Sequence, residues 1–222
     1  MDDDDLLKRL REQIERDLAP VRPLRAPWMR ALVPLGAGVT IGALVSLVAG
    51  VRPDIDVVGA WRLLGFLLLQ AAFCGGLFVI VLRWSIPAMS PSLATALLYA
   101  SGALLVQALI SWAILGRSAL SPPTGSELRI GLACLSAITL MSLAPLAAGA
   151  ALLLRGLPSR LLAAFALAAF ASGLTVEAVW RLHCRYSTWT HLLPFHWGAV
   201  LAALLVALIA ATYAGRPRPA GA

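Results

Sequence analysis

Six long apolar stretches dominate the sequence and restrict the fold more than any other feature. A helix of about 20 apolar residues crosses the roughly 30 Å hydrocarbon core of a bilayer. Stretches of this length, separated by short polar connections, occupy residues 31–50, 63–82, 93–115, 130–154, 161–180 and 192–214. None of them keeps a polar face that could meet water. The sequence therefore predicts an all-α polytopic membrane protein, in which a six-helix transmembrane domain occupies residues 31–214 and the lipid bilayer is a partner.

The composition excludes several other classes of protein. The chain is 60% apolar and only 13% charged, whereas ordinary soluble domains have about 45–50% apolar and about 25% charged residues. Its net charge of +7 is spread between the apolar stretches rather than clustered, so we expect no direct contact with nucleic acid. No P-loop or zinc-protease motif occurs, and no connection is long enough for a soluble catalytic unit. We therefore do not expect an enzyme.

Ionisable residues are almost absent from the apolar stretches, which counts against a transporter because transporters place such groups deep in the membrane. The one acid is Glu177, near the end of the fifth stretch. We expect it to be interfacial, within reach of water and of Arg181 four residues later. Gln70 and Gln107, in the second and third stretches, are expected to hydrogen-bond across helices, and Gly38 with Gly42 to serve close packing inside the bundle.

The distribution of basic residues orients the bundle. Of the 18 Lys and Arg residues, twelve lie on the side of the N-terminus and six on the opposite side. Because cytoplasmic loops are enriched in Lys and Arg, both termini are predicted to face the cytoplasm. Residues 1–30 then form a cytoplasmic N-terminal segment, and residues 215–222 form a short cytoplasmic tail.

The N-terminal segment contains a predicted short amphipathic helix with one apolar stripe. Its members recur at steps of three and four residues and are Leu6, Leu7, Leu10, Ile14 and Leu18. A short isolated helix is marginal in water, so this stripe needs a surface to lie against. The bilayer, the cytoplasmic face of the bundle and a groove on a partner protein are the three options. Seven acidic residues before residue 20 disfavour anionic lipid and favour a partner protein.

Two cysteines are predicted at the same depth near the outer face. Cys134 begins the fourth stretch, and Cys184 lies between the fifth and sixth. A disulfide or a shared ligand is feasible if their Cα atoms come within about 7 Å. A redox- or metal-responsive pair, a structural disulfide and two inert thiols all remain open. Arg181 and Arg185 are expected to lower the pKa of Cys184 and raise its reactivity. Cys74 is expected to be a small buried apolar residue.

All three histidines of the chain lie within 14 residues of one another, around and after the second of these cysteines. Thiolate and imidazole groups together suit zinc, copper and other soft or borderline metals. The candidate metal ligands are His183, Cys184, His191 and His196. A transient metal ion at this outer-face cluster is the one cofactor that the sequence indicates. The alternative interpretation leaves the histidines as interfacial polar residues.

Two polar blocks carry a resemblance to a known family. One is Leu-Ala-Pro-Val-Arg-Pro-Leu-Arg-Ala-Pro at residues 18–27, and the other extends from Leu-His-Cys at 182–184 to His-Trp-Gly at 196–198. With Cys134 early in the fourth stretch, they resemble the six-helix integral-membrane anti-sigma factors known as negative regulators of the extracytoplasmic-function sigma factor F. The resemblance extends over nearly the whole chain.

This resemblance implies a location and a function. The protein would be a multi-pass protein of the bacterial inner membrane. Its cytoplasmic N-terminal segment would hold an extracytoplasmic-function sigma factor away from RNA polymerase and release it on a periplasmic redox or metal stress signal. The apolar stripe would be the sigma-binding face, and Cys134 with Cys184 would sense the signal. A membrane thiol oxidoreductase and a small metal or solute transporter remain the alternatives.

Overall fold

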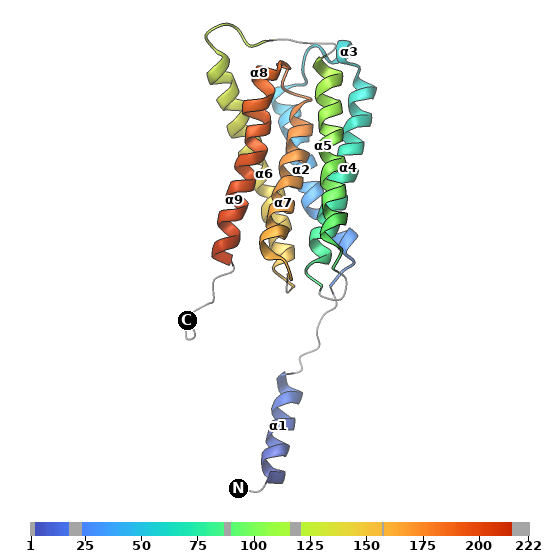
Figure 1. Cartoon of the computed structure of the whole chain (residues 1–222), viewed down its shortest axis with the longest axis vertical. Helices are drawn as coiled ribbons and strands as arrows, with labels where there is room; N and C mark the ends of the chain where they lie inside the picture. The colour runs from blue at the N-terminus through green and yellow to red at the C-terminus, as the bar shows by residue number, and fades with distance from the viewer. Residues whose placement is uncertain (1–2, 18–23, 87–89, 116–120, 157, 215–222) are drawn as a thin grey trace.

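The structure is a computed structural model that describes residues 3–17, 24–86, 90–115, 121–156 and 158–214. Of these residues 82% are helical and none lies in a strand. The elements are α1 (Asp3–Asp17), α2 (Pro27–Ala49), α3 (Ile55–Val58), α4 (Ala60–Arg83), α5 (Leu93–Leu115), α6 (Glu127–Leu153), α7 (Leu161–Trp180), α8 (Trp189–His191), the π-helical segment η2 (Leu192–Trp197) and α9 (Gly198–Ala214). Figure 1 shows a bundle of roughly parallel long helices, with α1 standing clear of it.

The predicted fold class is confirmed. Six helical spans are long and apolar enough to cross a membrane, and each lies where the sequence places an apolar stretch. The fourth span begins three residues earlier than expected, at Glu127. The sixth span begins at Trp189 because α8, η2 and α9 follow one another without a break.

The helix α7 forms the axis of the bundle. In its span 67% of the residues are buried, whereas in each of the other five spans at most 33% of the residues are buried. Glycines on α2 allow a close approach to α7: a Cβ atom at Gly38 would lie 3.0 Å from Thr175 Cγ2, and one at Gly42 would lie 2.7 Å from Val179 Cβ. These distances confirm that the glycine pair serves packing within the bundle, because any side chain there would force α2 away from α7.

The two ends of the bundle differ in what they carry. Helix α1 and the last residues of α9 lie at one end, whereas α3 and α8 lie at the other (Figure 1). The latter end also holds the loop that follows α7 and carries the second cysteine. The cysteine and histidine cluster and the N-terminal helix are therefore at opposite ends of the molecule.

Candidate thiol and imidazole site

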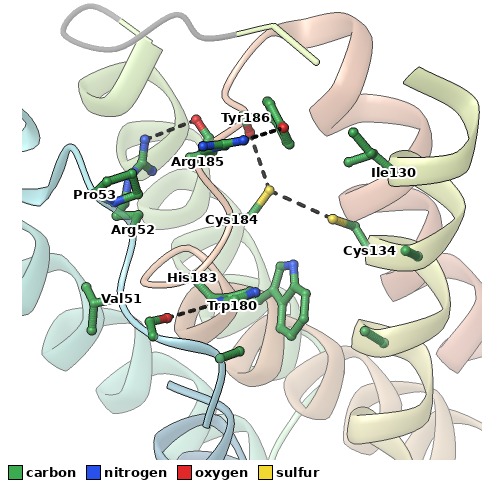
Figure 2. Close-up of a pocket in the computed structure, with 14 residues that line it drawn as sticks. Val51, Arg52, Pro53, Ile130, Cys134, Trp180, His183, Cys184, Arg185 and Tyr186 are labelled. Atoms are coloured by element: carbon green, nitrogen blue, oxygen red, sulfur yellow. Dashed lines mark hydrogen bonds between the residues drawn. The ribbon is translucent and has the colours of Figure 1, made fainter. Parts of the chain in front are cut away.

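Two thiols that are 50 residues apart in the sequence meet beside the end of α7. Cys134 comes from the second turn of α6, and Cys184 from the loop after α7, and their Sγ atoms are 3.8 Å apart. Both are free thiols and each side chain is only 6% exposed. Figure 2 shows the two sulfur atoms pointing toward one another. The two thiols, which the sequence predicted only to share a depth, are therefore in contact in the structure.

Two imidazoles complete the cluster from the last span. His191 Nε2 lies 3.6 Å from Cys184 Sγ, and the rings of His191 and His196 have centroids 5.3 Å apart. One ligand atom from each of Cys134, Cys184, His191 and His196 can be chosen so that all four lie within 4.8 Å of one another. All four residues are buried.

The π-helical segment η2 explains how two histidines five residues apart reach one site. In a regular α-helix, side chains five residues apart point about 140° away from each other, because each residue turns the helix by about 100°. A π-helix bonds residue i to residue i+5, which places such residues one above the other. Pro194 lies inside η2, where its missing N–H removes a regular α-helical hydrogen bond. The wider turn therefore aligns His191 with His196.

A buried carboxylate supports the cluster from α7. Glu177 Oε1 accepts hydrogen bonds from Arg181 Nε at 2.6 Å and from His196 Nδ1 at 3.1 Å. Gln107 of α5 donates to Glu177 Oε2, and Arg181 also donates to Ser111 Oγ at 3.0 Å. The predicted pairing of Glu177 with Arg181 is confirmed, as is the interhelical hydrogen bond of Gln107. The same prediction for Gln70 is wrong, because its amide donates to Cys74 Sγ on its own helix α4, at 3.6 Å. The predicted access of water to Glu177 is wrong, since its side chain is 1% exposed.

A cavity of about 610 Å³ opens beside the thiols. Both cysteines line it, together with Trp180, His183 and residues 49–53 of the loop after α2. The histidines of the last span do not line it. The sulfur atoms therefore lie between the cavity on one side and the buried imidazoles on the other, as Figure 2 shows for the cavity side.

The structure does not bring His183 into the cluster. Its Nδ1 makes a 2.9 Å hydrogen bond with the carbonyl of Gly50, and its ring packs edge-on against Trp180. The cluster therefore contains Cys134 in place of His183, which the sequence had suggested as a metal ligand. The spacing of residues along the chain could not reveal this replacement, because Cys134 lies on α6, far from the histidines in the sequence.

The expected activation of Cys184 by its arginine neighbours is wrong. The hydrogen bond with Cys134, followed by burial, raises the pKa of the Cys184 thiol. Arg181 is engaged by Glu177, and the exposed Arg185 donates to the hydroxyl of Tyr186 at 3.1 Å. Both arginines are close to Cys184 in the sequence, but their guanidinium groups bind other partners and not the thiol.

A buried arginine anchors the cysteine-bearing loop. Arg52 makes a two-pronged ion pair with Asp54, at 2.7 and 2.8 Å, and also reaches the carbonyl of Arg185 at 3.4 Å (Figure 2). Its backbone N–H donates to the carbonyl of Leu182 at 2.8 Å. The loop after α2 therefore fixes the loop after α7, which sequence reasoning had not connected.

Comparison with known families decides what kind of protein carries this site. The family model described as negative regulator of sigma F (NrsF) matches residues 15–216. The chain belongs to the NrsF family. Its members regulate a sigma factor negatively, so the partner of this NrsF protein is a sigma factor. No curated protein and no solved structure matches the chain.

The family match covers the candidate site completely but only the end of α1. The first three leucines of the predicted sigma-binding stripe precede it, and all three are exposed: Leu6, Leu7 and Leu10. The structure describes the helical backbone at Ile14, whereas Leu18 lies outside the described residues. In this NrsF protein the stripe thus begins on an exposed helix that projects from the bundle (Figure 1).

Proposed function

We propose that this NrsF protein is an inner-membrane anti-sigma factor whose cytoplasmic helix α1 sequesters an extracytoplasmic-function sigma factor. A redox or metal signal at the periplasmic site of Cys134 and Cys184 then releases that factor. The family match supports negative regulation of a sigma factor, and the six apolar spans support a place in the membrane. The excess of Lys and Arg on the side of the N-terminus supports cytoplasmic termini.

The exposed apolar face of α1 is the observation that carries the assignment of the capture site. Leu7 is 63% exposed, and Leu6 and Leu10 are 43% and 47% exposed. Amphipathic helices with such a face bind in apolar grooves of partner proteins. Burial of one leucine side chain contributes about 1.5–3 kcal/mol, which corresponds to roughly ten- to hundred-fold in affinity.

The packing of α7 provides a physical route between the two ends. Its outer end holds Glu177 beside the thiol site, and Thr175 and Val179 of the same end pack against Gly38 and Gly42 of α2. Helix α2 is the span that follows the N-terminal segment. A change of tilt in α7 would therefore reach the capture helix, and a tenfold release requires only about 1.4 kcal/mol of coupling.

Capture is tested with the full-length protein in detergent micelles and the purified sigma factor encoded beside it. We expect Leu10→Asp to weaken binding at least tenfold, because a carboxylate would enter the apolar contact. Gln13→Asp adds the same charge three residues later, on a polar position, and should bind nearly as the parent does. Equal binding by the parent and Leu10→Asp would show that α1 is not the docking helix.

Release is tested in cells with Cys134→Ser and Cys184→Ser. We expect both variants to keep the sigma factor captured under stress, so that a sigma-dependent reporter stays silent. In the oxidative form of the switch, a two-electron oxidant takes two electrons and two protons from the thiols and one S–S bond forms. Normal induction of the reporter in both variants would show that the thiols take no part in release.

A further inference from the structure

The geometry of the four buried side chains points to one ligand. We infer that Cys134, Cys184, His191 and His196 form a closed tetrahedral site for a single zinc-like divalent cation, with Glu177 as its positioning residue. The binding of the cation is independent of the proposed function. Only the statement that this cation is the signal rests on that proposal.

Two of the distances between the donor atoms match a tetrahedral zinc site. Zinc binds cysteine sulfur at about 2.3 Å and histidine nitrogen at about 2.0–2.1 Å, so tetrahedral geometry places two sulfurs about 3.8 Å apart and sulfur and nitrogen about 3.6 Å apart. The observed separations are 3.8 Å between the two Sγ atoms and 3.6 Å from Cys184 Sγ to His191 Nε2. The four donor atoms as a set lie within 4.8 Å of one another, so a bound cation would draw the more distant ones closer by about 1 Å.

His196 presents a buried nitrogen without a partner. Its Nδ1 is hydrogen-bonded to Glu177, whereas its Nε2 is buried and has no hydrogen-bond partner among the described residues. An orphaned polar atom in such a position costs free energy unless a ligand meets it. Because Nδ1 carries the proton that it donates to the carboxylate, the lone pair of Nε2 is free to bind a cation.

The surroundings of Glu177 fit the role of a carboxylate that orients a metal-binding histidine. Histidine ligands commonly donate their second nitrogen to a carboxylate, which fixes the ring and strengthens the ligand. Here Arg181 neutralises that carboxylate, and Gln107 and Ser111 hold the pair against α5. The charge of the site itself also balances, because two thiolates neutralise one divalent cation. Such a neutral site is compatible with a buried position.

The cavity beside the thiols supplies an entry path. A cation arriving through it meets both sulfur atoms before the imidazoles. Binding replaces two S–H bonds with two metal–sulfur bonds and two metal–nitrogen bonds, and the two protons leave through the same opening. No electron is transferred. Occupancy would link α6, the loop after α7, α8 and η2, which are the four segments that carry the ligands.

The test uses the full-length, reduced protein in detergent, with Co²⁺ as a spectroscopic stand-in and Zn²⁺ as competitor. We expect one Co²⁺ per chain, with sulfur-to-metal charge-transfer bands and the intense visible bands of tetrahedral cobalt, both removed by Zn²⁺. Cys134→Ser and Cys184→Ser should weaken the charge-transfer bands. His191→Ala and His196→Ala should keep them but lose the tetrahedral bands. His183→Ala is the matched control and should resemble the parent.

Glu177→Gln tests the positioning role. We expect Co²⁺ affinity to fall by about 10–100-fold, with the spectrum of the bound ion retained. Ser111→Ala disturbs the same hydrogen-bonded group at Arg181 but leaves the contact between Glu177 and His196 intact, so it should bind Co²⁺ nearly as the parent does. Equal losses of Co²⁺ affinity in the two variants would show that Glu177 has only a structural role.

The outcomes separate this inference from the proposed function. Absence of Co²⁺ binding in the parent, or unchanged spectra in both His191→Ala and His196→Ala, would overturn the metal site even if the sigma factor is captured. Tetrahedral Co²⁺ binding in a protein that captures no sigma factor would support the site and refute the proposed function. Release of a captured sigma factor by Zn²⁺ in the parent, but not in His196→Ala, would support both.

Discussion

The close approach of α2 to α7 allows the change in the free energy of unfolding on substitution of Gly42 to be estimated. Replacement of Gly42 by Ala would place a Cβ atom 2.7 Å from Val179 Cβ, which is a branch point that no side-chain rotation can move away. Carbon atoms pack at about 3.5–4.0 Å, so the helices must separate by roughly 1 Å. Overpacking of this kind costs about 1–3 kcal/mol. We expect Gly42→Ala to lower the free energy of unfolding by that amount, less the gain in helix propensity.

Gly36 on the same helix is the matched control. A Cβ atom there would meet nothing within 4 Å, so Gly36→Ala should keep only the propensity gain of about 1 kcal/mol. Since both variants share this gain, the difference between them isolates the packing cost. The measurement is reversible unfolding by SDS in mixed micelles, followed by loss of helical circular dichroism. Equal unfolding midpoints for the two variants would refute the claim that α2 and α7 touch through Gly42.

Two further predictions concern the thiol site. Gly131→Ala would make a methyl group clash with the ring of Phe195, so it should displace η2 and weaken Co²⁺ binding at least tenfold by titration. Unchanged affinity would show that η2 does not set the ligand geometry. Arg52→Ala removes the buried anchor of the cysteine-bearing loop, so Cys184 should react several-fold faster with a membrane-impermeant maleimide. Replacement of the exposed Arg62 by Ala should leave that rate unchanged, and equal rates in both variants would contradict the anchoring role.

Much of the fold could be predicted from local composition. A span of about 20 apolar residues has one stable arrangement in a bilayer, because every backbone polar group must be bonded within the helix. The six spans therefore required no knowledge of their neighbours. The amphipathic N-terminal helix followed in the same way from the spacing of Leu6, Leu7 and Leu10, and α1 is present as a helix with these side chains exposed.

The candidate site was only partly predictable. The sequence indicated that Cys134 and Cys184 share a depth, and the structure brings their sulfur atoms together. It named His191 and His196 as candidate ligands beside Cys184, but it did not indicate that Cys134 would complete this set while His183 turns to the carbonyl of Gly50. Cys134 lies on α6, whereas Cys184 and His183 lie in the loop after α7, and a regular α-helix would have pointed His191 and His196 in different directions.

Sequence by itself determined the number of spans, their approximate ends and the inventory of thiols, imidazoles and charged side chains. Tertiary structure alone decided which of these groups meet. The burial of Glu177 depends on α5, α7 and the last span together, and the alignment of the histidines depends on the π-turn around Pro194. The physical reason is that hydrophobicity acts on each segment separately, whereas a four-residue site depends on contacts between segments that are distant along the chain.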